Sequence, residues 1–140
     1  MPNNGRYYLT CQPTFEKGPA HMPQIAFASP LLPGMTAADR QAMTSFQSGE
    51  RKAAFEDSRR RAGITRESAW IQTTPNGDFA VVYMEADDLG QAFSTLGRSD
   101  APFDQWFRDH VRQVHGFSLE AGFHAPELML DYREESPSDT

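Results

Sequence analysis

From Gln24 to Tyr132 the hydrophobic and polar positions follow two regular periods, which predict an alternation of strands and helices. Short apolar runs with alternating orientation indicate strands, and apolar residues three or four positions apart indicate helices. The predicted strands are 24–29, 68–74, 79–85 and 126–132, and the predicted helices are 36–62, 87–97 and 102–116. A further short strand is expected within 6–10.

The ends of the predicted helices carry residues that satisfy free backbone groups. Thr36 is the expected N-cap of the first helix, and Asp39 is placed to complete a capping box. That helix ends at Gly63, because glycine readily adopts the left-handed C-cap conformation. The later helices show the same signals: Asp87 or Asp88 caps one, Ser99 or Asp100 caps the other, Pro102 lies in its first turn and Gly116 ends it.

A β-hairpin is the clearest local feature of the chain. Asn76-Gly77 lies between two β-rich runs and predicts a two-residue turn with positive φ at both positions. This turn would pair Thr74 with Phe79, Gln72 with Val81, Trp70 with Tyr83 and Ser68 with Glu85. One face is then aromatic and polar, and the other is small and apolar. Neither face looks fully solvated, so we expect both to be covered.

The element order β-α-β-β-α-α-β predicts an α+β fold of the ferredoxin-like, split βαβ type. In this arrangement an antiparallel sheet has helices on one face only. The domain is expected to span 24–132, after a flexible extension at 1–23 and before a disordered tail at 133–140. A second subunit would cover the free sheet face, so we expect a homodimer.

Composition narrows the class of protein. The 140 residues carry a net charge of −6, which disfavours binding to nucleic acid or to an anionic membrane. A single cysteine, Cys11, excludes an internal disulfide and a cysteine-rich zinc site. The sequence has no apolar run long enough to span a membrane and no secretory signal pattern, so a cytoplasmic location is expected.

Two histidines on the last predicted helix are the first candidates for chemistry. His110 lies in the middle of its apolar sector, and His115 lies at the edge of that sector in the last turn. Their five-residue spacing does not suit a two-histidine metal site, and no metal is expected. A neutral imidazole in an apolar pocket can act as a general base. The alternatives are a hydrogen-bonded core residue for His110 and favourable interaction with the helix dipole for His115.

The aromatic face of the hairpin supplies further candidates. Tyr83 could donate a hydrogen bond to a developing oxyanion, and Glu85 could orient a histidine or bind a polar group. Trp70 and Gln72 lie beside them on the same face. The equally weighted alternative is a structural pair of Trp70 and Tyr83 across the strands, with Glu85 ending its strand.

The stretch "VVYMEADDLGQAFSTLGRSDAPFDQWFRDHV" resembles the second half of antibiotic biosynthesis monooxygenase domains and of stress-responsive dimeric α/β-barrel domains. The span from Gln24 to Tyr132 resembles uncharacterised bacterial proteins of that superfamily, through "LLPG", "RRRAGI" and "WIQTTPNGDFAVVYMEADD". The resemblance implies a homodimer with facing sheets, a dimeric α/β barrel, and a cavity in each subunit between sheet and helices. It also implies chemistry such as polyketide cyclisation, cofactor-free oxygenation or haem degradation. His110 is further from the Ser-Asp turn than the haem-ligating histidine of such proteins.

The function expected from these observations is a cofactor-independent acid/base enzyme of the cyclase or isomerase type, in secondary metabolism. Its substrate would be a hydrophobic aromatic or polyketide-like small molecule. His110 would remove a proton and Tyr83, with Glu85, would stabilise the anion. Trp70, Gln72, Phe103, Trp106 and His115 would line the binding pocket. The alternatives are a monooxygenase, cofactor-independent or less readily haem-dependent, a non-catalytic binding module, and a structural dimer without a ligand.

Overall fold

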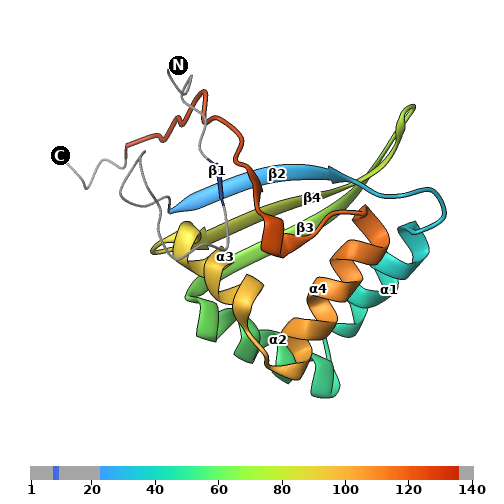
Figure 1. The fold of residues 1–140 in the computed structure, drawn as a ribbon. Coiled ribbons are helices and arrows are strands. Elements are labelled where there is room, and N and C mark those ends of the chain that lie inside the picture. The colour runs from blue at the N-terminus through green and yellow to red at the C-terminus, as the bar shows by residue number, and fades with distance from the viewer. Residues whose placement is uncertain (1–7, 10–22, 136–140) are drawn as a thin grey trace.

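The computed structural model describes residues 8–9 and 23–135 (Figure 1). The predicted flexible extension, apart from Tyr8, Leu9 and Pro23, and residues 136–140 of the predicted tail lie outside this part of the chain. The strands are β1 (Tyr8–Leu9), β2 (Gln24–Pro30), β3 (Ile64–Thr74), β4 (Gly77–Ala86) and β5 (Phe123–His124). The helices are α1 (Thr36–Ser45), α2 (Gly49–Ala62), α3 (Leu89–Arg98), α4 (Pro102–His115) and the short 3-10 helix η1 (Leu119–Ala121).

The main sheet is antiparallel and open, with the strand order β2-β4-β3. All four α-helices of the described chain lie against one of its faces, as Figure 1 shows. The main core joins sheet and helices through residues such as Ile25, Met84, Leu89 and Phe93. The predicted α+β class is confirmed, and the arrangement is compatible with a ferredoxin-like fold. None of the helices in the described residues is long and apolar enough to cross a membrane.

The hairpin forms, but its predicted register is wrong by two residues. Thr74 pairs with Gly77, so Pro75 and Asn76 form the turn. Pro75 fixes φ near the value that the first central position of a turn requires, and Thr74 Oγ1 donates to the Gly77 carbonyl at 2.7 Å. The observed pairs include Gln72 with Phe79, Trp70 with Val81 and Ser68 with Tyr83. Because the shift is an even number, every side chain keeps its predicted face.

The long first helix of the prediction is two helices. α1 ends at Ser45 and α2 begins at Gly49, where φ is 68°. This left-handed conformation cannot continue a right-handed helix. The break allows the ring of Phe46 to stack on Phe55 at 4.9 Å between centroids. As predicted, α2 ends at Gly63, which has φ 78°.

The predicted capping box of α1 is also wrong. Met35 is the N-cap and makes no side-chain capping bond. Thr36 Oγ1 instead donates to Asp78 Oδ2 at 2.7 Å, which ties α1 to the hairpin. The Asp39 carboxylate faces the interior and contacts His110.

The predicted cap of α3 is correct, because Asp88 accepts a hydrogen bond from the Gln91 amide. The predicted cap of α4, Ser99 or Asp100, is wrong. The N-cap is Ala101, which makes no side-chain capping bond, and Ser99 Oγ accepts from the Ala101 amide instead. Gly116, with φ 80°, ends α4.

The predicted last strand, 126–132, does not form. The chain is irregular there, and the strand β5 lies just before it, paired with β1 within the expected 6–10 region. Four large apolar side chains of this segment are 68–83% exposed: Leu128, Met129, Leu130 and Tyr132. An alternating pattern indicates only which side chains share a face, and a strand also needs a partner edge. This part of a single chain has no such partner in the described residues.

Candidate functional site

A cavity of about 290 Å³ lies between the sheet and the helices. Its sheet wall is the small apolar face of the hairpin together with β2, and the opposite wall comes from α1, α3 and α4. The lining residues that matter for chemistry are Asp39, Arg40, Glu67, His110 and His115. The walls around them are mainly apolar and include Met43, Ile71, Val82, Phe93, Leu96 and Phe107.

His110 and Asp39 form a buried pair on the helical wall of this cavity. His110 Nε2 lies 2.9 Å from Asp39 Oδ1, and the side chains are 7% and 5% exposed. The imidazole also stacks on Trp106, with 5.2 Å between centroids and 11° between planes. A carboxylate accepts only, so a neutral His110 carries its proton on Nε2 and has its lone pair on Nδ1.

The Nδ1 atom of His110 is reachable from the cavity. Within the described chain no buried side-chain nitrogen or oxygen lacks a hydrogen-bond partner. Among the described residues, the one hydrogen bond of the His110 ring is that of Nε2 to Asp39. Nδ1 is therefore not sealed in packing, and His110 lines the cavity. A ring held by a carboxylate on one nitrogen, with a free lone pair on the other, is the arrangement of a general base.

The second acidic group at the cavity, Glu67, is neutralised by Arg59. The Arg59 guanidinium donates to both oxygens of Glu67, at 2.7 and 3.4 Å. Its Cζ atom lies over the rings of Phe55 and Phe107, at 4.5 Å from each centroid. Cation–π contacts with both rings hold Arg59 in place. Glu67 is therefore a paired wall residue.

His115 lies at the end of α4 and also lines the cavity. Its Nδ1 is 2.8 Å from the carbonyl oxygen of Pro30, so Nδ1 carries a proton and donates it. The other ring nitrogen, Nε2, can accept a proton or donate one.

Tyr83, Glu85 and Gln72 lie on the opposite face of the sheet. Their neighbours in sequence, Val82, Met84 and Ile71, point to the cavity, and side chains alternate along a strand. Tyr83 Oη donates to Glu85 Oε2, and this hydrogen bond, then burial, raises the pKa of the phenol. The structure does not bring Tyr83 or Glu85 to His110.

The predicted aromatic pocket residues have different positions. Trp70 borders the cavity but is 57% exposed, between Ala69 and Ile71 in a strand whose orientation alternates. Phe103 belongs to an aromatic cluster with Phe46 and Phe55 rather than to the cavity wall. Trp106 stacks on the His110 ring, and the Cζ atom of Arg51 lies 3.8 Å from the centroid of the Trp106 ring.

Asp39 is a site residue for which the sequence predicts a different role, that of a helix cap. Its spacing from Ala42, Met43 and Phe46 places it instead on the apolar face of α1. An acidic residue on such a face indicates a buried partner. This spacing is the sequence signal that identifies Asp39 as a buried residue with a polar partner.

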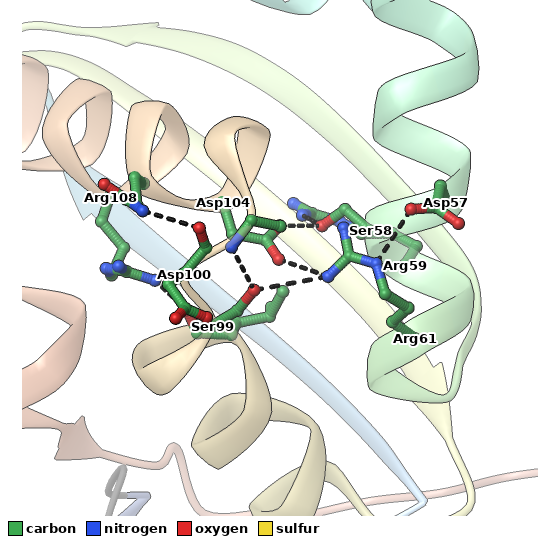
Figure 2. A network of polar contacts seen from close by, with 11 residues as sticks. Asp57, Ser58, Arg59, Arg61, Ser99, Asp100, Asp104 and Arg108 are labelled. Carbon is green, nitrogen blue, oxygen red and sulfur yellow. Dashed lines mark hydrogen bonds and ion pairs between the residues drawn. The ribbon is translucent and has the colours of Figure 1, made fainter.

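A polar network fixes α4, and with it His110, against α2. Figure 2 shows Asp104 of α4 facing Ser58 and Arg61 of α2. Ser58 Oγ and Arg61 Nη1 donate to the two oxygens of Asp104. Burial opposes ionisation of Asp104, but hydrogen bonds from Ser58, Ser99 and Arg61 outweigh it and lower the pKa of the carboxyl. The network therefore holds a charged group at the interface of two helices.

No model of a known protein family and no curated protein matches this chain. The site is therefore interpreted from its geometry. Within residues 8–9 and 23–135, no group of three or more His, Cys, Asp or Glu side chains is placed to hold a metal ion.

Proposed function

We propose that the protein is a cofactor-independent acid/base enzyme of the cyclase or isomerase type, acting on a hydrophobic aromatic or polyketide-like small molecule. The observation that carries this proposal is the His110–Asp39 pair on the wall of an apolar cavity. A base held by a carboxylate in such a place can remove a weakly acidic proton. The cavity of about 290 Å³ lies at the lower end of the range for small-molecule sites, so a substrate of one or two rings fits best.

The proposed reaction begins with a C–H bond next to a carbonyl group. His110 Nδ1 takes the proton, and the bonding electrons move to the carbonyl oxygen to give an enolate. Asp39 stabilises the imidazolium through Nε2. In an isomerisation the proton returns to another carbon. In a cyclisation the enolate attacks a second carbonyl of the same molecule, whose oxygen takes the proton.

We propose further that a second copy of the chain covers the outer sheet face, which gives the dimeric barrel. Trp70 on that face is 57% exposed, and Leu128, Met129 and Leu130 extend from the domain with most of their surface in solvent. Large exposed apolar side chains of this kind are more frequent at protein interfaces than on the rest of a surface. Light scattering should give twice the mass of one chain, and Trp70→Arg should shift it toward the monomer. A wild-type monomer at assay concentration would refute the dimer.

The enzyme proposal is tested by exchange of the α-protons of 2-tetralone in D₂O, followed by NMR. The wild type should accelerate exchange over buffer. His110→Gln and His110→Ala should each lower this acceleration about 100-fold or more, the scale of general base catalysis. Asp39→Asn should give a smaller loss, because it removes only the stabilisation of the imidazolium.

Matched controls separate this chemistry from general damage. His124→Ala changes a histidine outside the cavity, and Asp109→Asn changes an exposed carboxylate of α4. Both should exchange 2-tetralone like the wild type. Binding of 2-tetralone without any acceleration of exchange would show a binding module and refute the enzyme. Loss of exchange in the two controls as well would refute the assignment to His110 and Asp39.

A further inference from the structure

One cationic side chain of the cavity forms no ion pair in the described residues. Asp39 is paired with His110, and Glu67 with Arg59. Arg40 lines the same cavity and is exposed, but it makes no hydrogen bond, ion pair or ring contact within that part of the chain. Arg40 is therefore the one cation lining the cavity that forms no ion pair in the described residues.

Arg40 and His115 lie at the same end of the cavity, the end nearest the hairpin turn. Arg40 follows Thr36 by one helical turn, and Thr36 Oγ1 donates to Asp78 Oδ2. His115 donates to the carbonyl of Pro30, and the next residue, Leu31, donates its amide to the carbonyl of Asp78 at 2.9 Å. Arg40 and His115 therefore both lie near Pro30 and Asp78, at the end of the sheet next to the hairpin turn.

Asp78 is an acidic group whose pKa is affected by the charge of Arg40. Hydrogen bonds from Thr36 and Thr73, with a smaller effect of the Arg40 charge, lower the pKa of Asp78. Its carboxylate is therefore ionised at neutral pH. Asp78 is held by Thr36 and forms no ion pair with Arg40 in the described residues, so the guanidinium of Arg40 keeps its donors free.

The opposite end of the cavity is apolar. Phe93 and Leu96 of α3 face Met84 of β4 there. Glu67 pairs with Met84 across the strands, which places it at this end, where Arg59 neutralises it. The His110–Asp39 pair lies on the helical wall of the cavity, and side chains of the same wall contribute to both of its ends. One end of the cavity thus carries the unpaired Arg40 guanidinium, and the other end is apolar.

We infer that the ligand of this cavity is an amphipathic acid, whose carboxylate binds Arg40 and His115 and whose ring system lies among the apolar side chains beside His110. The inference deepens the proposed function and rests on it. An arginine side chain has a planar set of donors that matches a carboxylate with two parallel hydrogen bonds. His115 Nε2, when protonated, adds a third donor. The substrate class is thereby narrowed to aromatic or polyketide-like carboxylic acids.

The test compares 2-naphthoate with 2-naphthamide, which share the ring system and nearly the same shape but differ in charge. Calorimetric titration of the wild type should show about tenfold or stronger preference for 2-naphthoate, the scale of a charged hydrogen bond. Arg40→Gln should remove this preference and leave the affinity for 2-naphthamide unchanged. The control Arg60→Gln removes an exposed arginine of α2 outside this cavity and should keep the preference.

Salt supplies a second measurement that needs no variant. Added salt should weaken the binding of 2-naphthoate and not that of 2-naphthamide, because ions screen an exposed charge pair.

The outcomes distinguish failure of the anion subsite from failure of the proposed function. Equal binding of the two probes, or a preference that persists in Arg40→Gln, overturns the anion subsite and leaves the proposed enzyme in place. Failure of both probes to bind would overturn the ligand cavity, and with it both proposals.

Discussion

Replacement of Asp104 by alanine should destabilise the protein far more than replacement of Asp57, although both carboxylates bind the same arginine. Asp104 is 2% exposed and contacts Arg61 Nη1 at 2.6 Å (Figure 2). Asp57 contacts Arg61 Nε at 2.9 Å, but its side chain is 59% exposed. The two variants therefore compare a buried and an exposed ion pair at one guanidinium.

The magnitude follows from the groups that Asp104→Ala leaves behind. Hydrogen bonds to a charged group contribute about 1.5–3 kcal/mol each. Ser58, which is fully buried, loses its acceptor but still accepts from Arg59 Nη1 at 3.1 Å. The Arg61 side chain is 35% exposed and keeps Asp57, so its charge is not left buried and unpaired. We expect a loss of about 2–4 kcal/mol, near the lower end for a broken buried pair.

The assay is equilibrium unfolding in urea. Asp57→Ala should cost less than about 1 kcal/mol, as exposed pairs do. Asp104→Ala and Ser58→Ala should show a coupling energy in a double-mutant cycle, because they remove the same hydrogen bond. Equal destabilisation by Asp104→Ala and Asp57→Ala would refute the reasoning, since burial would then add nothing.

Three further predictions use the same structure. The extra stability of the wild type over Asp104→Asn should be fully present above the ordinary carboxyl pKa of 3.8, and it should be lost as the pH falls through the lower pKa of Asp104 in the folded protein. Urea unfolding of both proteins from neutral to strongly acidic pH measures this difference. A difference in stability that grows in acid would contradict the prediction. Gly116→Ala, at φ 80°, should lower the free energy of unfolding by about 1–2 kcal/mol, and Gly63→Ala, at φ 78°, by a similar amount; unchanged unfolding would refute the left-handed caps. Thr36→Val should raise the pKa of Asp78 toward its ordinary value, because the Thr36 hydrogen bond is the largest cause of its lowering; carboxyl NMR titration measures this, and an unchanged pKa would contradict the assignment.

The hairpin shows how far a sequence pattern can go. Alternation along 68–85 predicted both faces correctly, because the face of a side chain depends only on odd or even position. The register depends on which two residues make the turn. Pro75 moved the turn one residue toward the N-terminus, and the pairing shifted by two.

The candidate site was predictable only in part. The helical period of 103–114 placed His110 on a buried face, since that period is a local property of the chain. Its partner Asp39 is 71 residues away, and no local pattern joins the two. The same holds for Arg59 and Glu67, whose pairing requires α2 to lie against β3.

Local chemistry alone therefore determined the helix ends at Gly63 and Gly116, the two faces of the hairpin and the α+β class. Backbone dihedral preferences and side-chain periods act over a few residues and need no knowledge of the rest of the molecule. Tertiary structure decided the absence of a strand at 126–132 and the meeting of Asp39 with His110 in a cavity. These features depend on which segments come together in space, and packing between distant elements sets that.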